Sequence, residues 1–501
     1  MKAEINSVTL GQKATRGFSW LLGQTLGTKL INMATQVVLA WLLAREDFGL
    51  IGLAYTVTAF ISVLQQAGLR EILIHRHAQF NRWANPVFWM SACLGMGGML
   101  LTWAAIPLAT RVYHAPELAG LLLILSFNSV LGSLTVVPQA KLSNELRFGA
   151  MSVMTVVMAT VQAMTACGLA WLGWGAYAIA VSAVVGMGTL VGMLWSYAPH
   201  WPKRKMQVRR WRFMVGDSAA ILGTGVLLTV ISQGDYMALG IFHTAAVTGL
   251  YYFAFNLSMQ TITLFTGNLG SVLFPALSKL QNEPKRQTEA FIRAARLLAL
   301  VAIPACWTQA AIAGPLVRLI FPTKWYAAIP VIQILCFGMA FRAVGSPSGA
   351  LMQSQGRFKT LLILCSVMAA VYLSVVTTAA GLGGILSMAV VECLFFMILG
   401  PVQSYIGILH GGGRWRDIGK IYLPALTGAT VAILPGYIVA SLLPPMRGED
   451  IIRIGIVVIS AMGLFWLVMP RLAPKDWQEM HQRLRDVLYR RRNRKIAAVS
   501  I

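Results

Sequence analysis

The chain has 501 residues, of which 57% are hydrophobic and 12% are charged, and its net charge is +24. A soluble globular domain usually carries about 25% charged residues, so this composition excludes an ordinary soluble protein. In a membrane protein an excess of Lys and Arg reflects orientation in the bilayer, and we therefore expect no nucleic-acid partner.

Fourteen hydrophobic stretches are long enough to cross a bilayer as helices. Alternating segments of the kind that build membrane barrels are absent from the sequence. The sequence therefore predicts an all-α polytopic membrane protein with short loops and no cleavable signal peptide. The expected spans are 18–43, 49–69, 85–110, 118–140, 150–172, 175–198, 215–240, 246–277, 292–317, 325–353, 359–379, 384–408, 419–443 and 451–470.

Lys and Arg residues alternate between the loops in a way that supports these spans. With the N-terminus in the cytoplasm, 33 of the 41 basic residues fall in cytoplasmic segments and six on the opposite side. Because basic residues concentrate in cytoplasmic loops, we expect both termini to be cytoplasmic. The basic tail 471–501 is interpreted as a solvated helix attracted to anionic lipid headgroups, with docking of a partner protein as the alternative.

An internal repeat is indicated by matches at offsets of 210 and 200 residues. Ile124, Leu125, Phe127, Ala140, Arg147 and Phe148 match Ile334, Leu335, Phe337, Ala350, Arg357 and Phe358, and Gly49, Leu50, Ala54 and Tyr55 align with Gly249, Leu250, Ala254 and Phe255. The alternative is chance identity among apolar residues. We interpret the repeat as two six-helix lobes, 1–205 and 206–412, related by an axis along the membrane normal. Helices 13 and 14 (413–470) and the tail would be additions.

Among the ionisable residues inside the expected spans, four stand out: Lys29, Asp235, Arg342 and Glu392. Charges within a membrane are costly and are therefore functional candidates. Lys29, Asn32 and Gln36 follow helical spacing and form one polar stripe, as do Asn256 and Gln260. We expect these stripes and Arg342 to line a substrate cavity, because a planar guanidinium matches two phosphate oxygens.

A structural alternative exists for these charges. Lys29 or Arg342 could form a salt bridge with Asp235 or Glu392 that only joins helices. The two acids are also candidates for coupling transport to protons or sodium ions. We expect no catalytic residue, cofactor or metal site, because HExxH, GxSxG and Walker A sequences are absent and the six cysteines are interpreted as packing residues.

Three segments carry a family resemblance: LLAREDFGLIGLAYTVTAFISVLQQAGLREILIHR at 42–76, VLFPALSKLQ at 272–281 and FPTKWYAAIPVIQILCFGMAFRAVGSPSGALMQSQGR at 321–357. They resemble flippases of the polysaccharide transporter family, and the third is similar to the colanic-acid type. The resemblance spans residue 1 to about 410 and fades in the last four spans. Arg342 lies within the third segment, whereas Lys29 lies outside all three.

The resemblance implies a substrate class that hydropathy could not show. It is an undecaprenyl-pyrophosphate-linked oligosaccharide, moved by alternating access across the bacterial inner membrane for exopolysaccharide or lipopolysaccharide biosynthesis. Membrane lipids and the polymerase and glycosyltransferases of the same pathway are the implied partners. The same superfamily also holds multidrug extruders and the lipid II flippase.

Three other functions remain as alternatives. A multidrug/cation antiporter of the same superfamily would favour acids in its cavity, whereas here bases are expected. A membrane-embedded polysaccharide polymerase or acyltransferase would be expected to have a large periplasmic loop or an intramembrane His. A non-transporting scaffold would explain neither the repeat nor the intramembrane charges.

Overall fold

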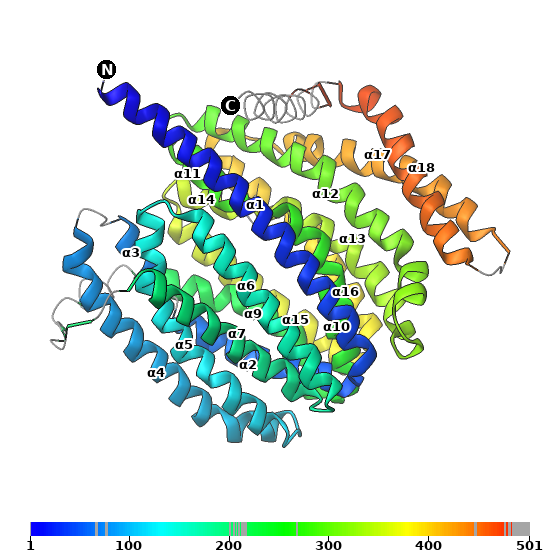
Figure 1. Ribbon diagram of the computed structural model, residues 1–501. Helices are drawn as coiled ribbons and strands as arrows, with labels where there is room; N and C mark the ends of the chain where they lie inside the picture. Colours follow the sequence, from blue (N-terminus) through cyan, green and yellow to red (C-terminus); the bar gives the residue numbers. More distant parts are fainter. Residues whose placement is uncertain are drawn as a thin grey trace, which may run out of the picture. The chain divides into compact units, whose positions relative to one another are not determined.

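The computed structural model describes residues 2–65, 69–75, 79–199, 202–203, 206, 208, 211, 218–266, 269–444, 448–474, 477–478 and 482. Every regular element within these residues is a helix (Figure 1). The helices of the first half are α1 (Lys2–Leu42), α2 (Arg45–Gln65), α3 (Leu69–His75), α4 (Phe80–Val112), α5 (Leu118–Asn144), α6 (Phe148–Trp171), α7 (Ala176–Tyr197) and α9 (Ser218–Phe242).

The second half continues without a strand in its described residues. Its helices are α10 (Ala245–Thr266), α11 (Leu269–Ser278), α12 (Pro284–Ile320), α13 (Ile329–Gly345), α14 (Ser348–Ser354), α15 (Phe358–Leu382), α16 (Ile385–Ile408), α17 (Trp415–Ser441) and α18 (Glu449–Leu472), with short 3-10 helices η3 (Thr323–Ala328) and η4 (Leu409–Gly411).

Twelve helical segments of the described residues are long and apolar enough to cross a bilayer. They correspond to expected spans 2–7 and 9–14. The first expected span lies in α1, and the eighth is covered by α10 and α11. The expected fold class, an all-α polytopic membrane protein, is therefore confirmed.

The tenth expected span differs from a single continuous helix. Residues 325–353 are divided among η3, α13 and α14, with Ser346 and Pro347 between the two α-helices. Proline has no backbone N–H and disfavours helical geometry in the residue before it, so the sequence Gly345-Ser346-Pro347 interrupts the helix.

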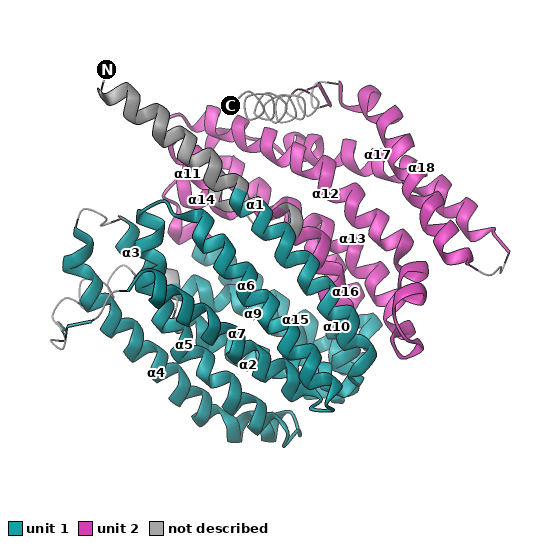
Figure 2. Ribbon diagram, in the orientation of Figure 1, with its two compact units in different colours: residues 1–253, 362–388 teal, residues 254–361, 389–501 magenta. Residues whose placement is uncertain are grey.

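The chain forms two compact units, coloured separately in Figure 2. Unit 1 comprises Met1–Phe253 and Leu362–Met388, and unit 2 comprises Ala254–Leu361 and Ala389–Ile501. Compact units reflect packing density, whereas the expected lobes reflect an internal repeat, so the division at residues 205 and 206 stays a prediction. Nearly all of the basic tail 471–501 and most of the basic loop after span 6 lie outside the described residues.

Two loops support the repeat residue by residue. Leu146 between α5 and α6 has φ +55°, and Gly356, 210 positions later, has φ +69°. The turns close through equivalent hydrogen bonds: the Arg147 N–H donates to the Leu142 carbonyl (2.9 Å), and the Arg357 N–H donates to the Met352 carbonyl (3.0 Å). The same backbone turn therefore recurs at the offset that the sequence indicates.

Another repeat pair meets in space. A Cβ added to Gly49 of α2 would collide with the carbonyl oxygen of Ala245, and one added to Gly249 of α10 would collide with that of Arg45. Ala245 and Gly249 follow Arg45 and Gly49 by 200 residues. The contact is thus reciprocal, as at a two-fold axis, and only glycine allows the two helices to approach so closely.

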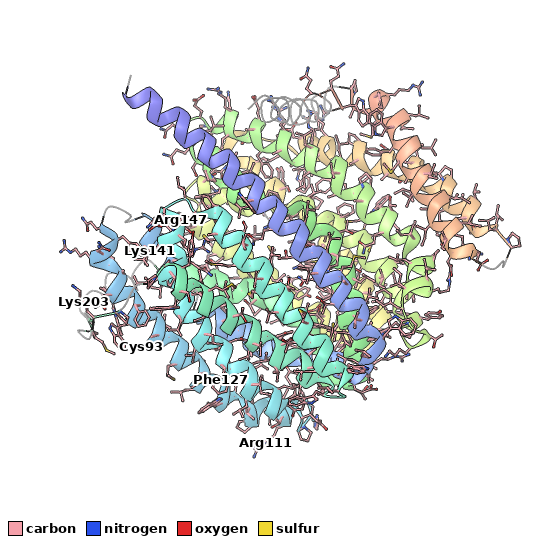
Figure 3. All side chains as sticks on the ribbon, in the orientation of Figure 1. Cys93, Arg111, Phe127, Lys141, Arg147 and Lys203 are labelled. Atoms are coloured by element: carbon pink, nitrogen blue, oxygen red, sulfur yellow. The ribbon has the colours of Figure 1, made fainter. Side chains whose placement is uncertain are left out.

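Within unit 1, basic residues gather at one end of the helices. Figure 3 labels Lys141, Arg147 and Lys203 toward one end and Arg111 at the other. The Lys141 ammonium donates to the Pro199 carbonyl (3.3 Å), and the Arg147 guanidinium lies 5.4 Å from the centroid of the Tyr197 ring. This distribution agrees with the loop pattern read from the sequence.

Candidate functional site

The helices α13 and α16 of unit 2 touch at backbone distance. A Cβ added to Gly338 would lie 2.5 Å from the Cα of Cys393, and one added to Gly345 would lie 2.7 Å from the Cα of Gly400. Both pairs are seven residues apart, which places each pair on one face of its helix. Small residues at such positions permit close helix packing in a membrane.

This close packing brings Arg342 against α16. The Arg342 Nη1 atom lies 3.8 Å from the Glu392 Oε1 atom. The guanidinium carbon lies 4.6 Å from the centroid of the Phe396 ring and 5.9 Å from that of Phe255 on α10. We refer to Arg342, Glu392, Phe255 and Phe396 as the Arg342 cluster. Residues of unit 2 from α10, α13 and α16 therefore meet around one cation.

The Arg342–Glu392 ion pair is loose. Its 3.8 Å separation exceeds the usual length of an N–H···O hydrogen bond. Among the residues that the structure describes, the Arg342 Nη1 atom is buried and has no hydrogen-bond partner. The Glu392 side chain is 1% exposed, whereas that of Arg342 is 22% exposed. The guanidinium therefore retains donor capacity for an anion and has a route to a ligand.

The two aromatic rings of the cluster can stabilise the positive charge of the Arg342 side chain. A guanidinium close to an aromatic ring can be stabilised by the negative face of the ring, and the effect grows where water is excluded. Neither ring accepts the directional hydrogen bonds that a phosphate can accept. Phe255 and Phe396 can thus hold Arg342 in position without using its donors.

The other predicted residues of unit 2 lie on α10. Asn256 and Gln260 are half-buried, and Asn256 follows Phe255 directly. The Gln309 side chain of α12 donates to the Leu257 carbonyl (2.8 Å), which joins α12 to the same stretch of α10. The α10 stripe therefore lies on the helix that contacts Arg342 through Phe255, and Asn256 is adjacent to Phe255 in sequence only.

The Lys29 stripe lies on α1 in unit 1. A Cβ added to Gly27 would lie 3.8 Å from the Cγ2 atom of Val156, so this side of α1 faces α6. At about 100° per residue, Lys29, Asn32 and Gln36 lie roughly half a turn away from Gly27. Lys29 and Gln36 are half-buried, and Asn32 is exposed. The stripe therefore avoids the α6 interface.

Asp235 lies in a different helix pair of unit 1. It is fully buried on α9, which packs against α2. Its Oδ1 atom accepts a hydrogen bond from the Tyr236 N–H (2.9 Å). Two positions earlier, Gln233 accepts a hydrogen bond from the Thr56 hydroxyl of α2 (3.2 Å). Its position and burial are compatible with the predicted ion-coupling role, which stays a prediction.

Some features of the site were missed by the sequence reasoning. Gly338 and Gly345 were not singled out, although their seven-residue spacing could have indicated a close helix contact. Phe255 was noted only as the repeat equivalent of Tyr55, and Phe396 had no distinguishing signal among the many apolar residues of its span. The polar pair Thr56 and Gln233 could have been noted, because both lie within expected spans.

The family and sequence comparisons both point to polysaccharide biosynthesis proteins. The family described as "Polysaccharide biosynthesis protein" matches residues 38–330. The lipopolysaccharide biosynthesis protein WzxC of Escherichia coli (strain K12) is 24% identical over 447 residues, covering 83% of this chain and 86% of that protein. The succinoglycan biosynthesis transport protein ExoT of Rhizobium meliloti (strain 1021) is 22% identical, covering 81% of each chain.

The fold also matches a solved transporter structure. The lipid II flippase MurJ in an inward closed conformation superposes with a TM-score of 0.72 at 14% identity, covering 90% of this chain and 99% of that chain. At this identity the match establishes the fold alone. It places the twelve spans of the described residues in a known transporter architecture.

Proposed function

Because the chain belongs to the polysaccharide biosynthesis protein family, we propose that it is a flippase that moves a lipid-linked oligosaccharide across a bacterial membrane. Its similarity to WzxC, a lipopolysaccharide biosynthesis protein, and to ExoT, a succinoglycan biosynthesis transport protein, supports the substrate class. The fold is one that a lipid II flippase also has, which is compatible with this mode of action. The product would serve exopolysaccharide or lipopolysaccharide biosynthesis.

The single observation that carries the proposal is the state of Arg342. A lipid-linked sugar on an undecaprenyl carrier presents a pyrophosphate, and Arg342 holds a planar donor within the membrane span without a close hydrogen bond to Glu392. Charge-assisted bidentate bonds to phosphate are among the strongest polar contacts in proteins. We assign Arg342 to the pyrophosphate, with Asn256 and Gln260 of α10 as polar contacts of the substrate.

The proposed cycle uses the same ion pair. In the empty protein Glu392 balances the Arg342 charge. Arrival of the pyrophosphate attracts the guanidinium, and Glu392 then takes up a proton or a sodium ion. Asp235 is a second candidate for this coupling. Alternating access carries the headgroup across while the polyprenyl tail stays in lipid.

Orientation and pathway belong to the same proposal. The distribution of 33 of 41 basic residues supports an inner-membrane protein with both termini in the cytoplasm. The headgroup would move from the cytoplasmic to the periplasmic side. The glycosyltransferases that build the lipid-linked unit and the polymerase that uses it are the expected partners.

The test is complementation of a strain that lacks the gene. Wild type, Arg342→Ala and Arg342→Lys are compared for surface polysaccharide and for lipid-linked precursor, with protein levels matched. We expect the deletion and Arg342→Ala to lose polymer and accumulate precursor. Arg342→Lys should be about tenfold impaired, because an ammonium cannot form the two parallel bonds of a guanidinium.

Arg318→Gln is the matched control. Arg318 belongs to the same unit but forms a salt bridge with Asp450 (2.8 Å) on α18, outside the Arg342 cluster. This variant should retain polymer synthesis. If the deletion strain has normal polymer and precursor levels but increased drug sensitivity, the flippase assignment is wrong and the protein is a multidrug antiporter.

A further inference from the structure

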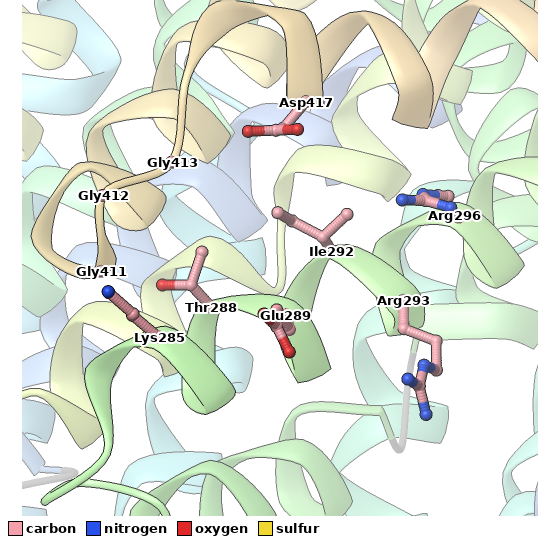
Figure 4. A pocket seen from close by; sticks show the side chains of 10 residues that line it. All are labelled: Lys285, Thr288, Glu289, Ile292, Arg293, Arg296, Gly411, Gly412, Gly413 and Asp417. Atoms are coloured by element: carbon pink, nitrogen blue, oxygen red, sulfur yellow. The ribbon is translucent and has the colours of Figure 1, made fainter.

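A polar cavity lies at the N-terminal ends of α12 and α17 in unit 2 (Figure 4). Its volume is about 580 Å³, within the usual size range of small-molecule sites. One wall is the first three turns of α12, and the other is the Gly411–Gly413 loop with the first turn of α17. The site does not include the Arg342 cluster and plays no part in the proposed cycle.

The α12 wall presents three cations on one helix face. Lys285, Arg293 and Arg296 line the cavity, together with Thr288 and Ile292. Their spacing follows the helical period, so they face the same side. Lys285 and Arg293 are exposed, and Arg296 is half-buried. One ammonium and two guanidinium groups thus line the cavity, and both kinds of group bind phosphate oxygens.

Two carboxylates also line the cavity, but one is already neutralised. Asp417 accepts hydrogen bonds from the Lys420 ammonium (2.9 Å) and from the Arg414 backbone N–H (3.0 Å). Glu289 is exposed to solvent. Counting Lys420, the groups at the cavity therefore keep a positive balance that favours an anion.

The loop wall is built from three glycines. A side chain on Gly411 would collide with the Thr288 hydroxyl and the Pro284 carbonyl, and one on Gly413 would lie 2.6 Å from Ile408. Gly412 has φ +81°, a conformation that favours glycine. The loop can therefore approach α12 closely and leave room for a ligand beside the positive end of the α17 dipole.

An independent sign of a ligand comes from Thr288. Its side chain is 3% exposed, and among the described residues its Oγ1 atom has no hydrogen-bond partner. Figure 4 shows this hydroxyl turned toward the Lys285 ammonium and the glycine loop. A buried hydroxyl without a partner is unfavourable unless something else supplies the bond. A phosphate oxygen in the cavity would supply it.

We propose that this cavity is a binding site for a phosphate ester, held by Lys285, Arg293, Arg296 and the Thr288 hydroxyl. The basic-residue pattern assigns the loops at this end of unit 2 to the cytoplasmic side, where two sources offer this chemistry. One is the headgroup of an anionic phospholipid, and the other is a free phosphate compound in the cytosol.

The test uses the full-length purified protein in detergent and in nanodiscs. Retained phosphatidylglycerol is measured by native mass spectrometry against phosphatidylcholine, and inorganic phosphate and pyrophosphate are titrated by calorimetry. The triple variant Lys285→Gln/Arg293→Gln/Arg296→Gln should bind at least about tenfold more weakly in one of the two assays. Thr288→Val should bind several-fold more weakly and serves as the decisive variant if the triple variant does not fold.

Arg286→Gln is the matched control. Arg286 lies on the same first turn of α12, is exposed and pairs with Glu283 (2.7 Å), but does not line the cavity. Weakening confined to phosphatidylglycerol assigns the site to a lipid headgroup, and weakening confined to inorganic phosphate or pyrophosphate assigns it to a soluble compound. If the triple variant and Thr288→Val both match Arg286→Gln in both assays, the site does not exist.

Discussion

The Arg342 guanidinium lies within ion-pair distance of Glu392 but outside hydrogen-bond distance, with 3.8 Å between Nη1 and Oε1. A pair that existed only to join two helices would gain from closing this gap, because the free energy of a buried ion pair depends on good hydrogen-bond geometry. The open geometry favours a role for Arg342 beyond joining α13 to α16.

Variants of Arg342 and Glu392 should affect stability and transport differently. Arg342→Ala leaves the buried Glu392 carboxylate without its cation and should lower the free energy of unfolding by about 3 kcal/mol. Adding Glu392→Gln removes that charge, so the double variant should regain thermal stability. Transport should stay lost, because the phosphate ligand is still missing. Recovery of polymer synthesis by the double variant would instead show a purely structural pair.

The contact between α13 and α16 should not tolerate a side chain at position 338. Gly338→Ala places a Cβ against the backbone of Cys393 and should cost about 1–3 kcal/mol, lowering the melting temperature and moving Arg342 away from Glu392. Gly349→Ala on α14 is the control, because a Cβ there meets nothing within 4 Å. Equal melting temperatures for the two variants would contradict the close contact.

The Lys29 stripe should affect transport without affecting the fold. Lys29 is half-buried and faces away from α6, so Lys29→Ala should leave the free energy of unfolding within about 1 kcal/mol of wild type. Polymer synthesis should fall about tenfold, and Lys29→Arg should restore most of it. The control is Thr35→Ala, since the Thr35 hydroxyl bonds only the Ile31 carbonyl of its own helix among the hydrogen bonds described (2.8 Å). Full activity of Lys29→Ala would show that Lys29 does not belong to the substrate site.

The reciprocal glycine contact should show strong coupling. Gly49→Ala and Gly249→Ala should each destabilise the protein by at least about 2 kcal/mol. The double variant should cost less than the sum, because one displacement of the helices relieves both collisions. Gly132→Ala on α5, where a Cβ meets nothing within 4 Å, should be neutral. Strict additivity would mean that the two glycines are not in contact.

The spans were predictable from sequence because hydropathy reports directly on the membrane. Their ends were less so: α12 begins at Pro284 rather than 292, since its first turns carry the charges that hydropathy counts against a span. The interruption at Ser346 and Pro347 was readable in principle from local chemistry.

The partner of Arg342 could not be read from the sequence. Asp235 and Glu392 were equally open as candidates, because both are single acids in apolar helices. The structure pairs Arg342 with Glu392. Gly338 and Gly345 set that register by meeting Cys393 and Gly400, and such a register depends on tertiary packing between distant segments.

The contact between Gly49 and Gly249 also limits which substitutions this chain can accept during evolution. In most packed pairs a larger residue on one side can be offset by a smaller one opposite. Here neither position has a side chain to give up, so no second substitution within the pair can restore the fit. The chain thus carries the same restriction at two positions, and a variant that loses either glycine must shift the backbone of α2 or α10.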